Sequence, residues 1–228
     1  GRGREGMKHR LAPPAQASKP GGQMGPSTST KQVLDQYSSE VVATVDNTDM
    51  FNQRELVART RVSAPAESVW EALTSYNSLQ EFIPGLGKNE CLERFENGVI
   101  LSQVGESDTP IGIKFKARTV LRIEEHPKGV AESYDLQPSA TDTPVKDITF
   151  EQIEGDFQVY RGLWRIAYHP KKPECDLVYV LSVKPQPWLP TGLVMNRVKR
   201  EVRRNLACVR LHSERMRQLG GRAKFVER

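Results

Sequence analysis

The stretch VSAPAESVWEAL, residues 62–73, changes from a strand-like pattern to the beginning of a helix within four residues. Pro65 suits the first helical position, because the N–H that proline lacks has no intrahelical partner there. Glu67 lies in the first turn, where the helix dipole favours a carboxylate. An apolar stripe follows, formed by Val69, Trp70 and Leu73. The stretch therefore predicts a strand followed directly by a short amphipathic helix.

Downstream, the pattern favours a second short helix and then a series of antiparallel strands. The second helix, SLQEF, is stopped by Pro84. The run IGIKFKARTVLRIEE, residues 111–125, alternates apolar with mostly basic side chains, which is typical of a long strand with one dry face. Asn97-Gly98 and Glu154-Gly155-Asp156 indicate hairpin turns. With ELVARTRV before the first helix and DLVYVLSVKP near the end, we expect about six or seven strands.

The C-terminal segment returns to a helical period. Between Leu193 and Met216, apolar side chains recur at intervals of three, four or seven, and arginines occupy much of the remaining surface. Residues 189–228 contain 11 basic and 3 acidic side chains, whereas the whole chain has a net charge of +5. We expect one long helix and then a frayed basic tail, residues 219–228. The basic side of the helix is either a solvated face or a membrane or partner surface, formed by Arg197, Arg200, Arg203 and Arg204.

The N-terminal segment, residues 1–50, has a different composition. It is rich in Gly, Pro, Ser, Thr and Gln, and it has too few apolar side chains to offset the entropy of ordering the chain. An Arg-rich, Ser-rich and acid-poor beginning is typical of organelle transit regions. We therefore expect a disordered segment containing the remnant of a transit peptide, followed by one ordered domain, residues 51–218.

Several classes of protein are disfavoured. No apolar run approaches the roughly 18 residues that a membrane span requires. The three cysteines are far apart, which favours a reducing compartment over a disulfide framework. The four histidines lack metal-ligand spacing, and no catalytic or cofactor motif is present, so we expect no metal, no cofactor and no catalytic residues. Nucleic acid is disfavoured because no aromatic side chains are interleaved with the basic run.

Four segments together resemble one superfamily. They are VSAPAESVWEALTSYNSLQEFIPGL, EGDFQVYRGLWRI, LVYVLSVKPQPWLP and VKREVRRNLACVRLHSERM. From Arg54 to Met216 the chain resembles the START-like (SRPBCC) superfamily, in its polyketide cyclase/dehydrase and lipid-transport branch. It is similar to coenzyme Q-binding START-domain proteins, which are common in plastids and cyanobacteria. Residues 127–146 depart from the family pattern, because this connection is longer than usual.

The resemblance implies an α+β helix-grip fold, in which a curved antiparallel sheet wraps around the long C-terminal helix and a cavity between them holds an apolar ligand. In that fold the helix that follows Pro65 covers one end of the sheet. Trp70 is then expected to be a structural lid on the core rather than a ligand contact. The resemblance also implies a chloroplast location, with the mitochondrion as the alternative.

Two groups of residues are candidates for the ligand site. Alternation places Phe115, Phe150, Tyr160, Trp164 and Tyr179 on the dry face of the sheet, where they either fill the core or line a pocket together with Trp188, Leu193 and Met195. Phe82, Trp188 and Leu193 lie in loops that the resemblance places near the cavity entrance. There they either pack as ordinary loop residues, form a gate or insert into a bilayer interface.

Three functions remain in competition. The first is a non-enzymatic carrier or chaperone for a lipid, quinone, isoprenoid or pigment. The second is a cyclase or dehydratase acting on a bound polyketide-like or terpenoid ligand, which requires an ionisable group in the cavity. The third is an assembly or scaffold factor that uses the basic C-terminal helix. We favour the carrier, with peripheral membrane contact as a further possibility and the oligomeric state left open.

Overall fold

The computed structural model describes residues 28–48, 50–108, 114–136, 143–188 and 191–226. These residues form four helices and eight strands. In chain order they are α1 Thr28–Glu40, β1 Val42–Asn47, β2 Arg54–Val62, α2 Ala66–Thr74, α3 Leu79–Phe82, β3 Leu86–Phe95, β4 Gly98–Asp108, β5 Lys114–His126, β6 Val145–Gly155, β7 Phe157–Tyr168, β8 Cys175–Pro185 and α4 Thr191–Val226.

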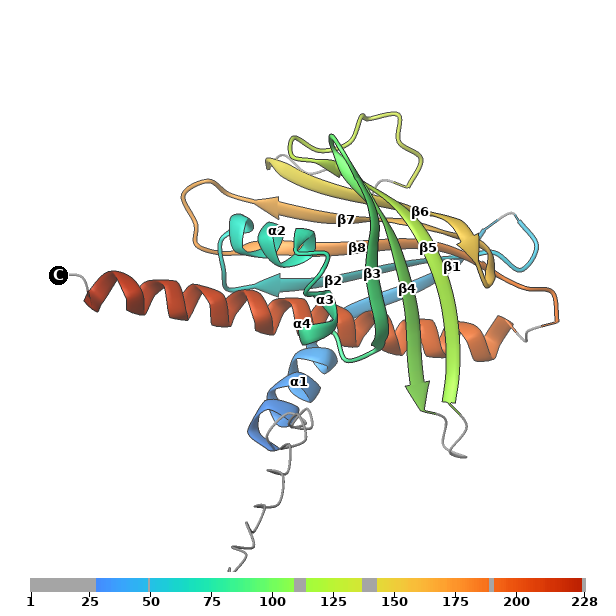
Figure 1. Ribbon diagram of the computed structural model, residues 1–228, viewed down its shortest axis with the longest axis horizontal. Coiled ribbons are helices and arrows are strands. Elements are labelled where there is room, and N and C mark those ends of the chain that lie inside the picture. Colours follow the sequence, from blue (N-terminus) through green and yellow to red (C-terminus); the bar gives the residue numbers. More distant parts are fainter. Residues whose placement is uncertain (1–27, 49, 109–113, 137–142, 189–190, 227–228) are drawn as a thin grey trace, which may run out of the picture.

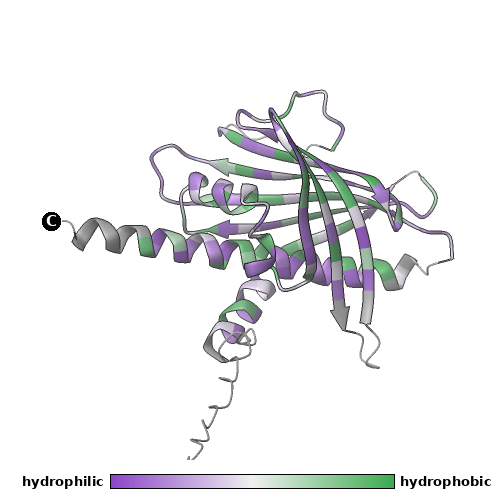
Figure 2. Ribbon diagram, in the orientation of Figure 1, coloured by the Kyte–Doolittle hydropathy of each residue, from purple (hydrophilic) through white to green (hydrophobic). Residues whose placement is uncertain are grey.

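The eight strands form one antiparallel sheet in the order β1-β2-β8-β7-β6-β5-β4-β3. The sheet curves so that β3, β4 and β5 cross α4, whereas β2 and β8 run beside this helix (Figure 1). Green and purple residues alternate along the strands in Figure 2, as expected of a sheet whose two faces differ in polarity. The expected α+β helix-grip fold is confirmed, with eight strands rather than six or seven.

The additional strand, β1, belongs to the segment for which we expected disorder. Residues 28–47 instead form α1 and β1, and β1 pairs with β2 at the edge of the sheet. The prediction fails here because a few apolar side chains, including Leu34 and Val41, are buried against the rest of the domain. Residues 1–27, where the transit-peptide remnant was expected, lie outside the described part of the chain.

A polar network fastens α1 to α4. The Tyr37 hydroxyl donates to Glu214 Oε2 at 2.7 Å, and the Arg210 guanidinium lies 3.7 Å from the centre of the Tyr37 ring. Arg210 also donates to Glu40 Oε2 at 2.6 Å and to Glu214 Oε1 at 3.1 Å. Helix α4 itself continues to Val226, so the expected frayed tail is helical over most of its length.

The short helix α2 covers one end of the sheet. It begins at Ala66, directly after Pro65, and it buries an apolar side formed by Ala66, Val69, Ala72 and Leu73. Trp70 is half-buried, packs against the main core, and has the Lys146 ammonium 5.3 Å from its ring centre. This position agrees with the expected role of Trp70 as a lid on the core.

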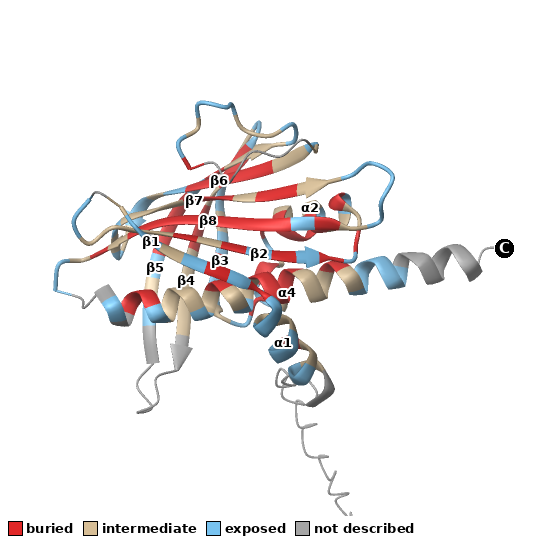
Figure 3. Cartoon of the chain, turned by 180° about the vertical axis from the view of Figure 1, so that it is seen from behind, coloured by how far each residue is buried: buried red, intermediate tan, exposed pale blue. Residues whose placement is uncertain are grey.

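Described residues 127–136 of the long connection after β5 cover part of the convex face of the sheet. Leu136 packs there with Leu163, Val178 and Val180 in a second, smaller apolar cluster. Under the same segment, the buried Asp147 carboxylate pairs with the Arg165 guanidinium at 2.7 Å. The departure from the family pattern thus adds a cover on the convex face and leaves β5 paired with β6. Figure 3 shows buried residues concentrated along the central strands β6, β7 and β8.

Candidate functional site

The strand registers bring the predicted aromatic residues together on the concave face. Trp164 on β7 is paired with Ile148 on β6 and with Tyr179 on β8, and Phe150 is paired with Gly162. Because side chains alternate between the faces of a strand, Tyr160 and Trp164 point to the same side. Of the five aromatic residues predicted for the dry face, the four with described side chains are buried in the main core or packed against it: Phe150, Tyr160, Trp164 and Tyr179.

These side chains form one aromatic cluster. The Phe150 and Tyr179 rings are stacked at a centroid distance of 5.5 Å, and Trp164 lies 4.4 Å from Tyr179. Tyr160 lies 5.8 Å from Phe150 and 5.1 Å from Phe157, which the sequence analysis did not select. Phe157 pairs with Pro185 at the start of β7, a contact that the sequence alone does not reveal. We call Phe150, Phe157, Tyr160, Trp164 and Tyr179 the aromatic cluster.

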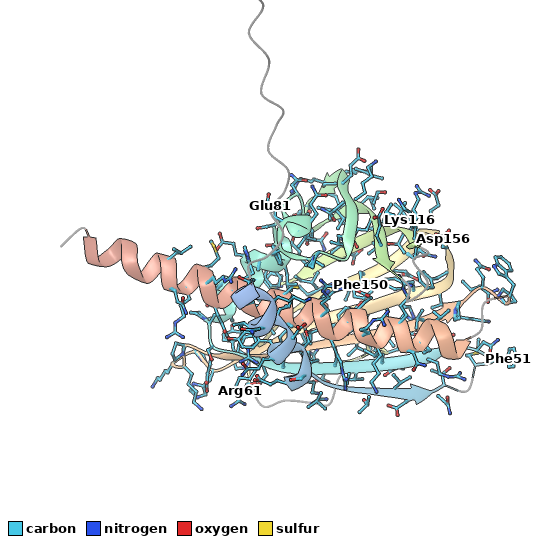
Figure 4. All side chains as sticks on the ribbon, turned by 90° about the horizontal axis from the view of Figure 1, so that it is seen from below. Phe51, Arg61, Glu81, Lys116, Phe150 and Asp156 are labelled. Carbon is cyan, nitrogen blue, oxygen red and sulfur yellow. The ribbon has the colours of Figure 1, made fainter. Side chains whose placement is uncertain are left out.

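A glycine makes room for this cluster. A Cβ atom built on Gly162 would collide with the Phe150 ring and with the Val180 carbonyl oxygen. Without that atom, the Phe150 ring can lie over β7 and meet both tyrosines. Figure 4 shows Phe150 near the middle of the molecule, beside α4 in the view from below.

Part of the aromatic cluster is accessible to solvent. Trp164 is half-buried although it has Ile148 and Tyr179 as neighbours on the two adjoining strands. Those strands close the sheet on both sides, so solvent must reach Trp164 from the concave side. Tyr160 and Phe157 are also half-buried, whereas Phe150 and Tyr179 are buried. A strip of reachable aromatic surface therefore extends along β7 toward the β6–β7 turn.

Two phenol hydroxyls lie within the cluster. The Tyr160 and Tyr179 oxygens are 3.5 Å apart. Burial raises the pKa of Tyr160 and raises that of Tyr179 well above its usual value. Both phenols are therefore neutral at physiological pH and can donate a hydrogen bond, but neither is a ready general base.

The remaining predicted pocket residues are distributed differently. Met195 on α4 is buried in the main core, whereas Trp188 is 76% exposed and therefore does not line the cluster. Phe82 is half-buried and stacks on His212 of α4 at 4.1 Å, which disfavours its insertion into a bilayer. The side chains of Phe115 and Leu193 lie outside the described residues.

The four predicted surface arginines are not equally available. Arg200 and Arg204 are exposed, whereas Arg197 and Arg203 are half-buried. Arg200 also lies 4.0 Å from the carboxylate of Glu201. The exposed basic surface on this part of α4 is therefore smaller than the sequence pattern indicated.

Exposed apolar side chains gather at the end of the domain where α4 begins. Met50 and Phe51 in the β1–β2 turn are 58% and 84% exposed, and Trp188 lies in the β8–α4 loop. The Gln53 side chain, which follows this turn, donates to Ser182 Oγ near the end of β8 at 2.8 Å. The two connections therefore leave the same end of the sheet, where Figure 4 places Phe51. We call Met50, Phe51 and Trp188 the apolar tip.

Two buried cysteines and the metal-ligating side chains complete the description of the reactive groups. Burial raises the pKa of Cys175 to about 12 and that of Cys208 to about 11, so both are thiols rather than thiolates at neutral pH. Within the described ranges, no group of three or more His, Cys, Asp or Glu side chains is placed to hold a metal ion. None of the described helices is long and apolar enough to cross a membrane.

Solved structures share this architecture at low sequence identity. A STAR-related lipid transfer protein fragment from Xanthomonas axonopodis is 14% identical, with a TM-score of 0.60 over 76% of this chain and 93% of that chain. Human StAR-related lipid transfer protein 5 is 9% identical, with a TM-score of 0.60 over 78% and 84%. The Zhui aromatase/cyclase from Streptomyces sp. R1128 is 18% identical, with a TM-score of 0.55 over 72% and 94%.

At these identities the likeness establishes the fold alone. No curated protein sequence matches the chain. The family model "Polyketide cyclase / dehydrase and lipid transport" matches residues 62–210, which is more than half of the 228 residues. This match, together with the helix-grip architecture, supports the START/SRPBCC assignment. The chain therefore belongs to the polyketide cyclase/dehydrase and lipid transport family of the START-like superfamily.

Proposed function

We propose that the protein binds an apolar small molecule between the concave face of the sheet and α4, and that it acts as a carrier or chaperone for this molecule. The observation that carries the proposal is the half-buried Trp164 on a central strand. A bound molecule would cover this aromatic surface, and pockets for apolar ligands combine aromatic walls with a few polar groups. Membership of a family that includes lipid transport proteins supports the same reading.

The carrier is favoured over the cyclase or dehydratase by the chemistry of the aromatic cluster. Acid–base catalysis requires a group that exchanges a proton near the working pH. Burial moves the pKa of both cluster phenols away from neutrality. The cluster therefore provides stacking surfaces and hydrogen-bond donors, which suit binding better than proton abstraction.

The binding proposal can be tested directly. The protein is purified from its own source and examined by native mass spectrometry for a bound molecule, which is then extracted with solvent and identified. In a second experiment, Nile red, an uncharged apolar dye, is titrated into ligand-free protein. We expect a co-purifying apolar molecule and saturable dye binding that weakens several-fold in Trp164→Ala. Leu92→Ala is the control, because Leu92 is an exposed apolar side chain on β3, outside the aromatic cluster and the apolar tip, and its replacement should leave dye binding unchanged. The absence of both a bound molecule and dye binding would overturn the proposal.

We further propose that the carrier exchanges its ligand at a bilayer interface through the apolar tip. Aromatic and other large apolar side chains on protruding loops favour the boundary between headgroups and acyl chains. The reachable aromatic strip on β7 leads toward the β6–β7 turn at the same end, where Figure 4 labels Asp156. Exposed Arg200 and Arg204 on the first half of α4 add attraction to anionic lipids.

Vesicle sedimentation tests this contact. Phosphatidylcholine vesicles with and without phosphatidylglycerol are compared for the wild type and for Phe51→Ser combined with Trp188→Ser. We expect the double variant to lose most of its vesicle binding at unchanged thermal stability. Leu92→Ser is the control, because Leu92 is 53% exposed near the opposite end of the sheet. Equal binding of the two variants would reject the tip as the contact.

Three finer expectations stay predictions within this proposal. They are a coenzyme Q-like or other quinone ligand, a chloroplast location with the mitochondrion as the alternative, and a scaffold role for the basic side of α4. Fluorescence microscopy of the tagged protein in its own cells checks the location. A pull-down of partner proteins checks the scaffold role. Binding should be sensitive to salt and should be lost in the double variant Arg200→Glu with Arg204→Glu, since both side chains are exposed.

A further inference from the structure

The two tyrosines of the aromatic cluster have more hydrogen-bond donors than the described residues satisfy. Each phenol has one O–H donor, and a buried donor normally has a partner. The single contact between the two oxygens, at 3.5 Å, accounts for only one of the two donors. Among the described residues, neither hydroxyl has another hydrogen-bond partner. One phenol O–H therefore remains to be satisfied in the aromatic cluster.

The differing burial of the two rings identifies the free donor. Tyr179 is buried between Phe150 and Trp164, so its hydroxyl has Tyr160 as its available acceptor. Tyr160 is half-buried and adjoins Phe157 on the reachable strip of β7. When Tyr179 donates to the Tyr160 oxygen, Tyr160 is the acceptor of this contact and its own O–H is not used by it. The Tyr160 O–H is then available to a bound molecule.

We propose that Tyr160 donates a hydrogen bond to a neutral acceptor oxygen of the ligand, and that Tyr179 orients Tyr160 by donating to its oxygen. This inference rests on the proposed ligand-binding function and adds the chemical class of the ligand. The ligand has a flat or unsaturated apolar body that stacks on Phe157 and Trp164. It carries a carbonyl oxygen, as in a quinone, ketone or ester, where it meets Tyr160.

A neutral oxygen fits this position better than an anionic group. Burial raises the pKa of Tyr160, and no charged side chain of the described residues contributes to this shift. A carboxylate or phosphate at this position would lose its hydration shell. Among the described residues, no cation in direct contact with the Tyr160 hydroxyl would compensate for that loss. A carbonyl needs only the one donor that Tyr160 supplies.

A matched pair of probes tests the inference. Anthraquinone and anthracene have the same ring skeleton, and only the first carries carbonyl oxygens. We expect the wild type to bind anthraquinone about 3- to 10-fold more tightly, the effect of one net hydrogen bond in a dry site. Tyr160→Phe should abolish this preference and leave anthracene affinity unchanged. Tyr179→Phe should reduce the preference, because Tyr160 then loses its orienting donor.

Tyr134→Phe is the control, because Tyr134 is a partly buried phenol packed on the convex face. A spectroscopic readout separates a hydrogen bond from a packing effect: the carbonyl stretching frequency of bound anthraquinone should be lower in the wild type than in Tyr160→Phe.

Failure of both probes to bind would count against the proposed function itself. Equal binding of both probes to wild type and variants, with an unshifted carbonyl band, would overturn the Tyr160 assignment while the binding site stands. Stronger binding of anthraquinone-2-carboxylate than of anthraquinone would overturn the preference for a neutral oxygen.

Discussion

Replacing Arg165 by methionine should destabilise the domain strongly, because it leaves the Asp147 carboxylate buried without its cation. Asp147 is fully buried, and its two oxygens accept from Arg165 Nε at 2.9 Å and from an Arg165 terminal nitrogen at 2.7 Å. One of these oxygens also accepts from the Val130 backbone N–H at 2.9 Å. The variant keeps the Val130 contact but loses both charge-assisted bonds from the guanidinium.

The expected cost follows from the burial of the pair. Breaking a buried ion pair by removing one partner typically costs about 3–5 kcal/mol, because the remaining charge is uncompensated. For a chain of this size, that corresponds to a drop in Tm on the order of 10 °C. Replacing both residues with apolar side chains removes the buried charge. Asp147→Val with Arg165→Met should therefore recover part of the loss and leave a cost of about 1–3 kcal/mol for the unpaired Val130 N–H.

Urea unfolding monitored by circular dichroism measures these differences. Arg161→Met is the control on the same strand, because its ion pair with Asp135 is largely exposed and should be worth no more than about 1 kcal/mol. We expect Arg165→Met to be the least stable variant, the double variant to be intermediate, and Arg161→Met to be close to wild type. The reasoning is refuted if Arg165→Met is as stable as either of the other two variants.

Three further changes test other parts of the fold. Gly162→Ala should cost about 3 kcal/mol or more in urea unfolding and weaken Nile red binding, because the new methyl group meets both the Phe150 ring and the Val180 carbonyl oxygen of the neighbouring strand. Tyr37→Phe should cost about 1 kcal/mol, since the hydrogen bond to Glu214 is charge-assisted but only part-buried, and a limited-proteolysis assay should show faster cleavage within α1. Burial lowers the pKa of His212 below its usual 6.5, so the unfolded chain binds more protons than the folded chain as pH falls through that value. Acidification below about pH 6.5 should therefore destabilise the wild type more than His212→Phe, and equal urea midpoints for the two proteins across pH 5–8 would contradict this.

The faces of the long strands could be predicted from the sequence because a two-residue period is a local property. Phe150, Trp164 and Tyr179 lie on three different strands, and their parity alone placed them on one face, which the strand registers confirm. Their ring contacts depend on pairing between residues far apart in the chain. The role of Gly162 was equally hidden, because only the three-dimensional approach of Phe150 shows why a side chain is excluded there.

The N-terminal elements could not be predicted for a related reason. A prediction from composition considers only the apolar surface that a segment can bury by itself, and α1 has few apolar side chains. Its stabilising partners are on α4: Tyr37 and Glu214 are separated by 177 residues, and Arg210 and Glu40 by 170. Of the apolar tip, Met50 and Phe51 were not predicted. Phe51 is exposed because it lies in a tight turn, and the residue type alone does not indicate this exposure.

The two halves of α4 are held differently, and this difference bears on how a ligand would enter. The second half is fastened by Arg210, by Glu214, which also accepts from the Ser63 backbone N–H at 2.9 Å, and by Arg217, which donates to the Ser63 carbonyl at 2.6 Å. The first half begins beside the apolar tip, at the end toward which the aromatic strip on β7 extends. The first half instead contacts the domain through buried apolar side chains, including Val194, Met195 and Val202. An apolar ligand that enters at the start of α4 would therefore displace apolar contacts rather than ion pairs.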